Sequence, residues 1–128
     1  MKEKGGCIFM AQMYITCVIL MILDVITGII NAAKDGKIES TVMRKGLYNK
    51  FCEMATLGAT HVIEYATANI DIGINLHLFN IVAIYIIVME IVSVLENICL
   101  MNEGIGKLFA PILNQLKHYL NKESEEEN

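Results

Sequence analysis

The chain has 128 residues, of which 55% are hydrophobic and only 19% are charged. A single domain is therefore expected, and its charged share is below the roughly one quarter that soluble domains carry. One proline and no tryptophan argue against a β-sandwich with many turns, and the apolar residues come in long blocks for which lipid is the simplest solvent.

The first apolar block runs from Cys7 to about Ala33 and contains one charged residue, Asp24. About 20 apolar residues suffice to cross the ~30 Å hydrocarbon layer, so the block predicts a transmembrane helix over 7–33. A cleaved signal peptide is the alternative, but the block is too long for its apolar region, and Asp24 and Asn31 fit a cleavage site poorly.

A charged connection over residues 34–50 is expected to end this helix and to form a loop or a short surface helix. The second block, 51–67, is the weakest candidate span because it contains two glutamates and a histidine. A helix lying at the membrane interface is its alternative. A turn over 68–77 leads to the third span, predicted over 78–101.

A short amphipathic helix is predicted over 107–121, because leucine or isoleucine recurs every four residues. Pro111 is tolerated only in the first turn of a helix, so the helix is expected to begin near it. The segment is too short and polar to cross, and it should lie on the membrane surface or against a partner helix. The acidic residues 122–128 predict a disordered tail, which leaves 1–121 as a single membrane domain.

Basic residues are concentrated in the 34–50 connection, whereas the 68–77 turn has none. Cytoplasmic loops of membrane proteins are enriched in lysine and arginine. With three spans, this places the N-terminus outside and the C-terminus in the cytoplasm. If 51–67 lies on the surface instead, both termini share a side. The expected topology determinants are Lys34, Lys37, Arg44, Lys45 and Lys50.

Each predicted span has its polar residues on one side of the helix. An ionised acid at the bilayer centre costs on the order of 3 kcal/mol, so such residues usually face a bundle interior or water. One copy of three helices offers little interior for them, which favours an oligomer. The expected pore-lining or helix–helix polar contacts are Asp24, Thr27, Gly28, Asn31, Glu53, His61, Glu64, Glu90, Ser93, Glu96 and Asn97.

Purely structural roles are the alternative for several of these polar residues. Asp24 is as well explained by a structural bond to a neighbouring helix, and the glutamates near block ends (Glu53, Glu90 and Glu96) by snorkelling toward the headgroups. The cysteines form no CxxC pair and lie near no histidine at metal-ligand spacing. They are expected to be small buried hydrophobes, and no metal or cofactor is expected.

Several motifs follow one another in a characteristic order. Asp24-Val-Ile-Thr-Gly28 lies late in the first span, and Arg44-Lys-Gly-Leu47 lies in the connection. His61 is followed by an acid three residues on, and Glu90-Ile-Val-Ser-Val-Leu-Glu-Asn97 ends the third span. With Pro111 beyond it, this ordered set resembles the phage holin family, which also includes toxin-secretion holins. The similarity covers roughly residues 17–118, and Glu64 stands where the family more often has aspartate.

The resemblance implies an all-α membrane protein, not an enzyme, that accumulates in the bacterial cytoplasmic membrane and associates with itself. It would open large pores through which an endolysin, or a toxin in a non-lytic variant, escapes. A small oligomeric ion channel or transporter subunit is the alternative. A channel would be favoured by a filter-like glycine run and a transporter by an inverted repeat. Neither is evident in the sequence. The basic cluster is one short connection beside a span, so nucleic-acid binding is not expected.

Overall fold

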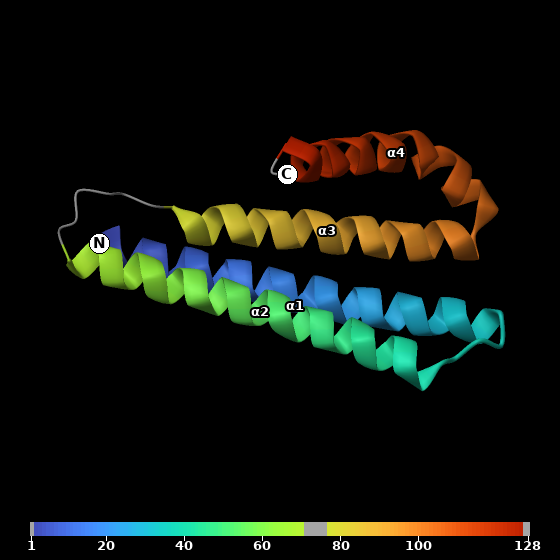
Figure 1. Cartoon of the computed structure of the whole chain (residues 1–128), viewed down its shortest axis with the longest axis horizontal. Helices are drawn as coiled ribbons and strands as arrows, with labels where there is room; N and C mark the ends of the chain where they lie inside the picture. The colour runs from blue at the N-terminus through green and yellow to red at the C-terminus, as the bar shows by residue number, and fades with distance from the viewer. Residues whose placement is uncertain (1, 71–76, 127–128) are drawn as a thin grey trace.

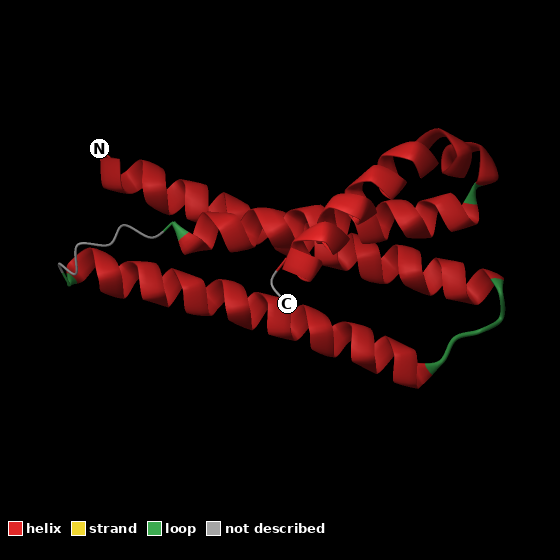
Figure 2. Cartoon of the chain, turned by 45° about the horizontal axis from the view of Figure 1, so that its top comes forward, coloured by secondary structure: helices red, strands yellow, loops and turns green. Residues whose placement is uncertain are grey.

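The computed structural model describes residues 2–70 and 77–126, which form four helices and no strand (Figure 2). These are α1 (Lys2–Lys34), α2 (Ser40–Asn69), α3 (Leu78–Met101) and α4 (Glu103–Glu126). The expected all-helical fold is confirmed. Most of the predicted turn, residues 71–76, lies outside the described residues.

The end of α1 is set by local chain geometry. Gly36 has a φ of 64°, a left-handed conformation in which a side chain would be strained. The Gly36 N–H donates to the Ala33 carbonyl at 3.1 Å, and the Lys37 N–H donates to the Ala32 carbonyl at 3.0 Å. This pair of bonds is the Schellman motif, which satisfies carbonyls left open at a helix end.

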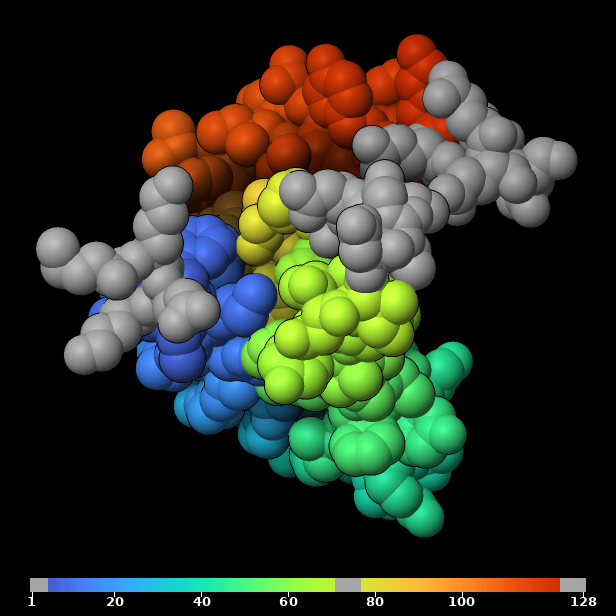
Figure 3. All heavy atoms as spheres, turned by 90° about the vertical axis from the view of Figure 1, so that its left-hand side faces the viewer, coloured from blue at the N-terminus to red at the C-terminus, as the bar shows by residue number. Residues whose placement is uncertain are grey.

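Helix α3 lies at the centre of the molecule. Helices α1 and α2 pack on one side of it, and α4 folds back along the other side (Figure 1). The end-on view in Figure 3 shows the same order, with α4 separated from α1 and α2 by α3. Helices α1 and α2 meet each other over only a short stretch. The contacts of α3 therefore hold the bundle together.

The buried core lies where α1, α2 and α3 meet. Cys17, Leu57, Phe79 and Ala83 are fully buried there, and Met21 and Ile86 nearly so. Cys7 and Cys52 are exposed and Cys99 is half-buried. The expectation of four buried cysteines is therefore right for one and wrong for two, because Cys7 and Cys52 lie on faces that no other helix covers.

Two helices, α1 over Gly5–Lys34 and α3 over Leu78–Met101, are long and apolar enough to cross a membrane. Helix α2 does not meet that measure along the part of the chain the structure describes. The chain is thus a helical protein with two membrane-length apolar helices, and the third span stays a prediction.

The helices are longer than the sequence pattern indicates. Residues 40–50, expected as a loop or separate helix, are the first turns of α2. Helix α4 starts at Glu103 and contains Pro111 in its interior, so the expectation that it begins near the proline is wrong. It also continues through residues 122–126, where a disordered tail was expected. Lysine and glutamate favour helix, which accounts for the extension.

The early start of α4 has a visible cause in Asn102. Its Oδ1 accepts hydrogen bonds from the Gly104 N–H at 3.0 Å and the Ile105 N–H at 3.2 Å. An asparagine at this position satisfies backbone donors that a helix start leaves open. The helix is therefore under way before Pro111, and its ribbon bends in its first half, as a proline inside a helix requires (Figure 1).

Candidate functional site

A charged cluster joins the three bundled helices near their middle. The Lys50 ammonium of α2 lies 2.8 Å from Asp24 Oδ2 of α1, and it donates to both Glu90 carboxylate oxygens of α3 at 2.6 and 2.7 Å. The side chains of Lys50, Asp24 and Glu90 are only 15%, 17% and 4% exposed. Each helix thus contributes one charge, and the three charges meet inside the bundle.

The charge state of Lys50 follows from these contacts. Burial works against the charged ammonium, but its close contacts with the Asp24 and Glu90 carboxylates favour the charged form. The lysine therefore stays protonated and can neutralise the carboxylates around it.

Asn97 extends this cluster along α3. Its Nδ2 donates to Asp24 Oδ1 at 3.0 Å and to the Thr27 hydroxyl oxygen at 3.3 Å. The Thr27 hydroxyl in turn donates to the Leu23 carbonyl of its own helix. Gly28 lies beside the amide, where an added Cβ would be 3.6 Å from Asn97 Nδ2. The Asp-x-x-Thr-Gly segment is thus the α1 side of a polar contact with α3.

Glu53 lies three residues after Lys50 on α2. Its Oε2 atom is buried and accepts no hydrogen bond from the residues that the structure describes. A buried acceptor without a partner costs about 1–3 kcal/mol. The cluster therefore contains one carboxylate oxygen that no described residue satisfies.

A second polar cluster lies nearer the end of the bundle at which α3 begins. The Tyr14 hydroxyl of α1 hydrogen-bonds to His61 Nδ1 of α2 at 3.2 Å, and both rings pack against Phe79 of α3. Glu64 of α2 accepts the Phe79 backbone N–H at 2.9 Å. Because the first N–H groups of a helix lack intrahelical partners, Glu64 caps α3 from a neighbouring helix.

Glu96 lies on the other side of α3, where it forms an ion pair with Lys117 of α4. This pair is more exposed than the charged cluster, at 36% for Glu96 and 55% for Lys117. Asn31 and Ser93 are half-buried. No hydrogen bond among the described residues joins either side chain to the two polar clusters.

A cleft of about 540 Å³ opens between the second half of α1 and the first half of α2. Apolar residues of both helices form its walls, and Asp24, Lys50 and Asn97 lie along it. The cleft exists because α1 and α2 touch each other only briefly. The charged cluster is therefore reached from one side of the bundle.

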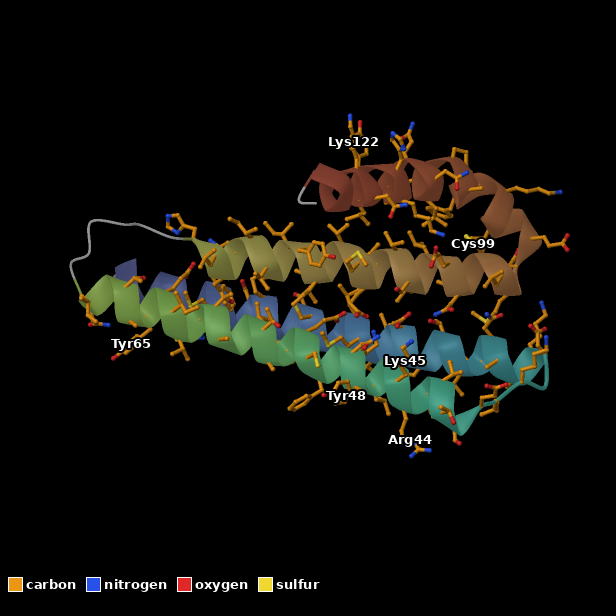
Figure 4. All side chains as sticks on the ribbon, viewed as in Figure 1. Arg44, Lys45, Tyr48, Tyr65, Cys99 and Lys122 are labelled. Atoms are coloured by element: carbon orange, nitrogen blue, oxygen red, sulfur yellow. The ribbon has the colours of Figure 1, made fainter. Side chains whose placement is uncertain are left out.

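Two partners in these clusters were not identified from the sequence. Lys50 was grouped with the bases of the connection, although a lysine just before a span has the reach to enter the bundle. Tyr14 gives no polar signal in the sequence, because it lies within the first apolar block. The other expected topology residues (Lys34, Lys37, Arg44 and Lys45) are exposed, and Arg44 points away from the bundle (Figure 4).

The clusters hold helices together by charge and hydrogen bonding. Within the described parts of the chain, no group of three or more His, Cys, Asp or Glu side chains is arranged to hold a metal ion. The arrangement supports structural contact between helices, and these residues would meet water if the helices separated.

Comparison with known proteins gives one result. The model of the bacteriophage holin family matches residues 6–118, a range that contains both polar clusters and most of α4. No curated protein and no solved structure matches the chain significantly. The match agrees with the two membrane-length apolar helices, and its extent shows that this chain belongs to the bacteriophage holin family, a family of membrane proteins and not of enzymes.

Proposed function

We propose that this protein is a pore-forming holin, which associates with itself in the bacterial cytoplasmic membrane and releases an endolysin or a toxin. The observation that supports this most is the buried cluster of Asp24, Lys50 and Glu90 between membrane-length helices. Charges inside a membrane are costly and mark function by default. Here they are paired within one chain, as a protein that must first accumulate without leaking requires.

The proposal includes α2 as a third span over 51–67. The residues that lower its hydropathy are Glu53, His61 and Glu64, and all three are half-buried toward the bundle. Its exposed positions in this range, such as Phe51, Val62 and Ile63, are largely apolar. A helix with its charges turned inward can lie in lipid although its mean hydropathy is modest.

The topology proposed is a multi-pass one, with the N-terminus outside and the C-terminus in the cytoplasm. Exposed basic residues at the start of α2 and the end of α1 lie at the same end of the bundle (Figure 4). Lysine and arginine favour the cytoplasmic side. Lys50 adds little to this asymmetry, because its charge is paired inside the bundle.

One copy of the chain pairs most of its own polar residues. A single copy was expected to have too little interior for its polar residues, whereas one chain pairs most of them in its two clusters. Self-association is therefore not required to satisfy the polar faces of the helices. Membership of the holin family is what supports it. In the proposed mechanism the clusters hold each copy closed, and Asp24, Glu90 and Asn97 come to flank water when copies rearrange.

The test is expression of the chain in bacteria with and without a co-expressed endolysin. We expect an abrupt collapse of the membrane potential, and lysis when the endolysin is present. Steady growth at high membrane levels of the protein would contradict the proposal. Graded, ion-selective currents without passage of folded proteins would favour the ion-channel alternative.

A further inference from the structure

The cleft between α1 and α2 combines apolar walls with a charged outer end. Its volume of about 540 Å³ falls within the range of about 300–1,000 Å³ that is typical of ligand pockets. Val42, Met43 and Leu47 of α2 line it and are themselves exposed, so the cleft opens toward whatever surrounds the bundle. Its inner end reaches Asp24 and Lys50 of the charged cluster.

The cleft lies at the level of the proposed cytoplasmic membrane surface. The first span is predicted to end at residue 33 and the second to begin at residue 51, and the cleft follows α2 from Glu39 to Lys50. This stretch is about 16 Å long at 1.5 Å per residue, whereas the headgroup layer on each side of the membrane is about 5–8 Å thick. The cleft therefore reaches from the headgroups into the hydrocarbon layer, where its α1 wall contains Asp24.

The outer end of the cleft carries a net positive charge. Six charged residues lie at this end of the bundle: Lys34, Asp35, Lys37, Glu39, Arg44 and Lys45. Four bases against two acids leave a net charge of +2, and Lys37 and Glu39 line the cleft itself. Helix α2 begins here without a side-chain cap from Glu39, and the N-terminus of a helix also favours negative charge. The outer end therefore suits an anionic group.

The charge and the apolar walls favour one occupant over the others. Water would leave the apolar walls exposed to solvent. A second copy inserted in the same direction would bring its own basic end to the same level, and like charges repel. An anionic phospholipid supplies both a negative phosphate for the outer end and acyl chains for the walls. Basic pockets between transmembrane helices on the cytoplasmic side are known to bind such headgroups.

We propose that the cleft binds one anionic phospholipid of the cytoplasmic leaflet, with its phosphate at Lys37 and the start of an acyl chain along Val42 and Leu47. This rests on the membrane insertion and topology of the proposed function, and not on the opening of a pore. A lipid in this position covers the side from which the charged cluster is reached. It thereby keeps water away from Asp24 and Lys50 while the copy is closed.

The absence of tryptophan from the sequence allows a test by fluorescence. Met43→Trp places a single reporter in the wall of the cleft. Tyr48→Trp is the matched control, because Tyr48 lies on the same helix, is 69% exposed and does not line the cleft. Each full-length protein would be placed in vesicles of equal parts phosphatidylglycerol and phosphatidylcholine. Two sets of vesicles differ only in which of the two lipids carries bromine on its acyl chains, since bromine quenches tryptophan fluorescence.

We expect stronger quenching of Met43→Trp when phosphatidylglycerol carries the bromine, and equal quenching of Tyr48→Trp by the two lipids. The same excess at both reporters would show anionic lipid gathered around a basic surface and would overturn the proposal. Equal quenching of Met43→Trp by the two lipids, or quenching by neither, would overturn it as well. Specific quenching combined with a failure to lyse bacteria would contradict the proposed pore-forming function alone.

Two charge variants in the Met43→Trp protein test the position of the phosphate. Lys37→Gln removes the base that lines the cleft, and we expect about a fivefold loss of the preference for phosphatidylglycerol, because one base near an anionic lipid contributes about 1 kcal/mol. Arg44→Gln removes a charge from the same end of the bundle, but Arg44 points away from it (Figure 4). This control should have the smaller effect, and an equal or larger one would contradict a phosphate at Lys37.

A third variant tests whether the lipid enters the cleft. A Cβ added to Gly46, which lines the cleft, meets no atom within 4 Å, so Gly46→Leu should fill the space and abolish the preference for phosphatidylglycerol. Gly58→Leu is the matched control, because Gly58 lies on the same helix outside the cleft and its added Cβ is equally free of contacts. Circular dichroism checks that both variants keep their helix content. A preference that survives Gly46→Leu would overturn the proposal.

Discussion

Helix α3 carries two ion pairs six residues apart that differ in their surroundings. Glu90 faces α1 and α2, is almost fully buried and is held by Lys50 together with Asp24. Glu96 faces α4 and pairs with Lys117, whose side chain is more than half exposed. The same kind of contact is therefore a buried ion pair that joins three helices on one side of α3 and a weak surface contact on the other. Burial is the variable that separates them, since water screens the second pair and not the first.

The largest effect is expected from Lys50→Met. It leaves the Asp24 and Glu90 carboxylates buried without a cation, and breaking a buried pair in this way costs about 3–5 kcal/mol. Unfolding in detergent micelles, followed by circular dichroism, measures the loss. Adding Asp24→Asn and Glu90→Gln should restore much of it by removing the stranded charges. A loss as small as that of a surface pair would show that the cluster is not buried in the folded protein.

A smaller loss is expected from Asp24→Asn. Lys50 keeps its two bonds to Glu90, and the asparagine oxygen can still accept from Asn97, so only one charged contact disappears. Hydrogen bonds to charged groups contribute about 1.5–3 kcal/mol, and the same unfolding measurement gives the value. A loss equal to that of Lys50→Met would mean that Asp24, and not Lys50, holds the cluster together.

Tyr14→Phe should cost less again. The change removes the hydroxyl that bonds to His61 and keeps the ring that packs against Phe79. A hydrogen bond between uncharged groups contributes about 0.5–1.5 kcal/mol. His61→Phe is a useful companion, because it removes the other partner of the same bond. If the two changes together cost the sum of the single ones, the contact at 3.2 Å contributes nothing.

The smallest effect is expected from Lys117→Gln. Exposed pairs contribute about 0–1 kcal/mol, and salt reduces that further. Stability should change little, and the small difference from the unmodified chain should shrink as sodium chloride is raised. A salt-independent loss comparable to that of Lys50→Met would refute the contrast between the two sides of α3.

The helical architecture was accessible from the sequence because it depends on block lengths. Apolar runs of this length favour membrane-spanning helices, and the family match confirms the family that the sequence resembles. The positions at which the helices begin and end were harder to predict from the sequence. The start of α4 depends on a cap from Asn102 that outweighs the signal of Pro111, and local rules alone do not rank one above the other.

The contacts between the polar faces of the helices could be predicted only in part from the sequence. Helical periodicity placed Asp24 and Asn97 on the polar faces of two different helices, and the fold brings them within 3.0 Å of each other. Periodicity did not reveal that Lys50 lies between Asp24 and Glu90, because Lys50 comes from a segment that reads as a connection. It also did not reveal that one copy pairs most of its own polar groups, and for that reason the polar faces were taken to favour an oligomer.

By itself, the sequence determined that this is a helical membrane protein of the holin family, since apolar block length and residue order are properties of the chain. Only the tertiary structure decided which polar groups meet. Residues 24, 50, 90 and 97 lie on three helices, and their contacts depend on how those helices rotate and slide against one another. It also decided that α4 lies along α3, because that position rests on the close approach of Gly106 to Cys99.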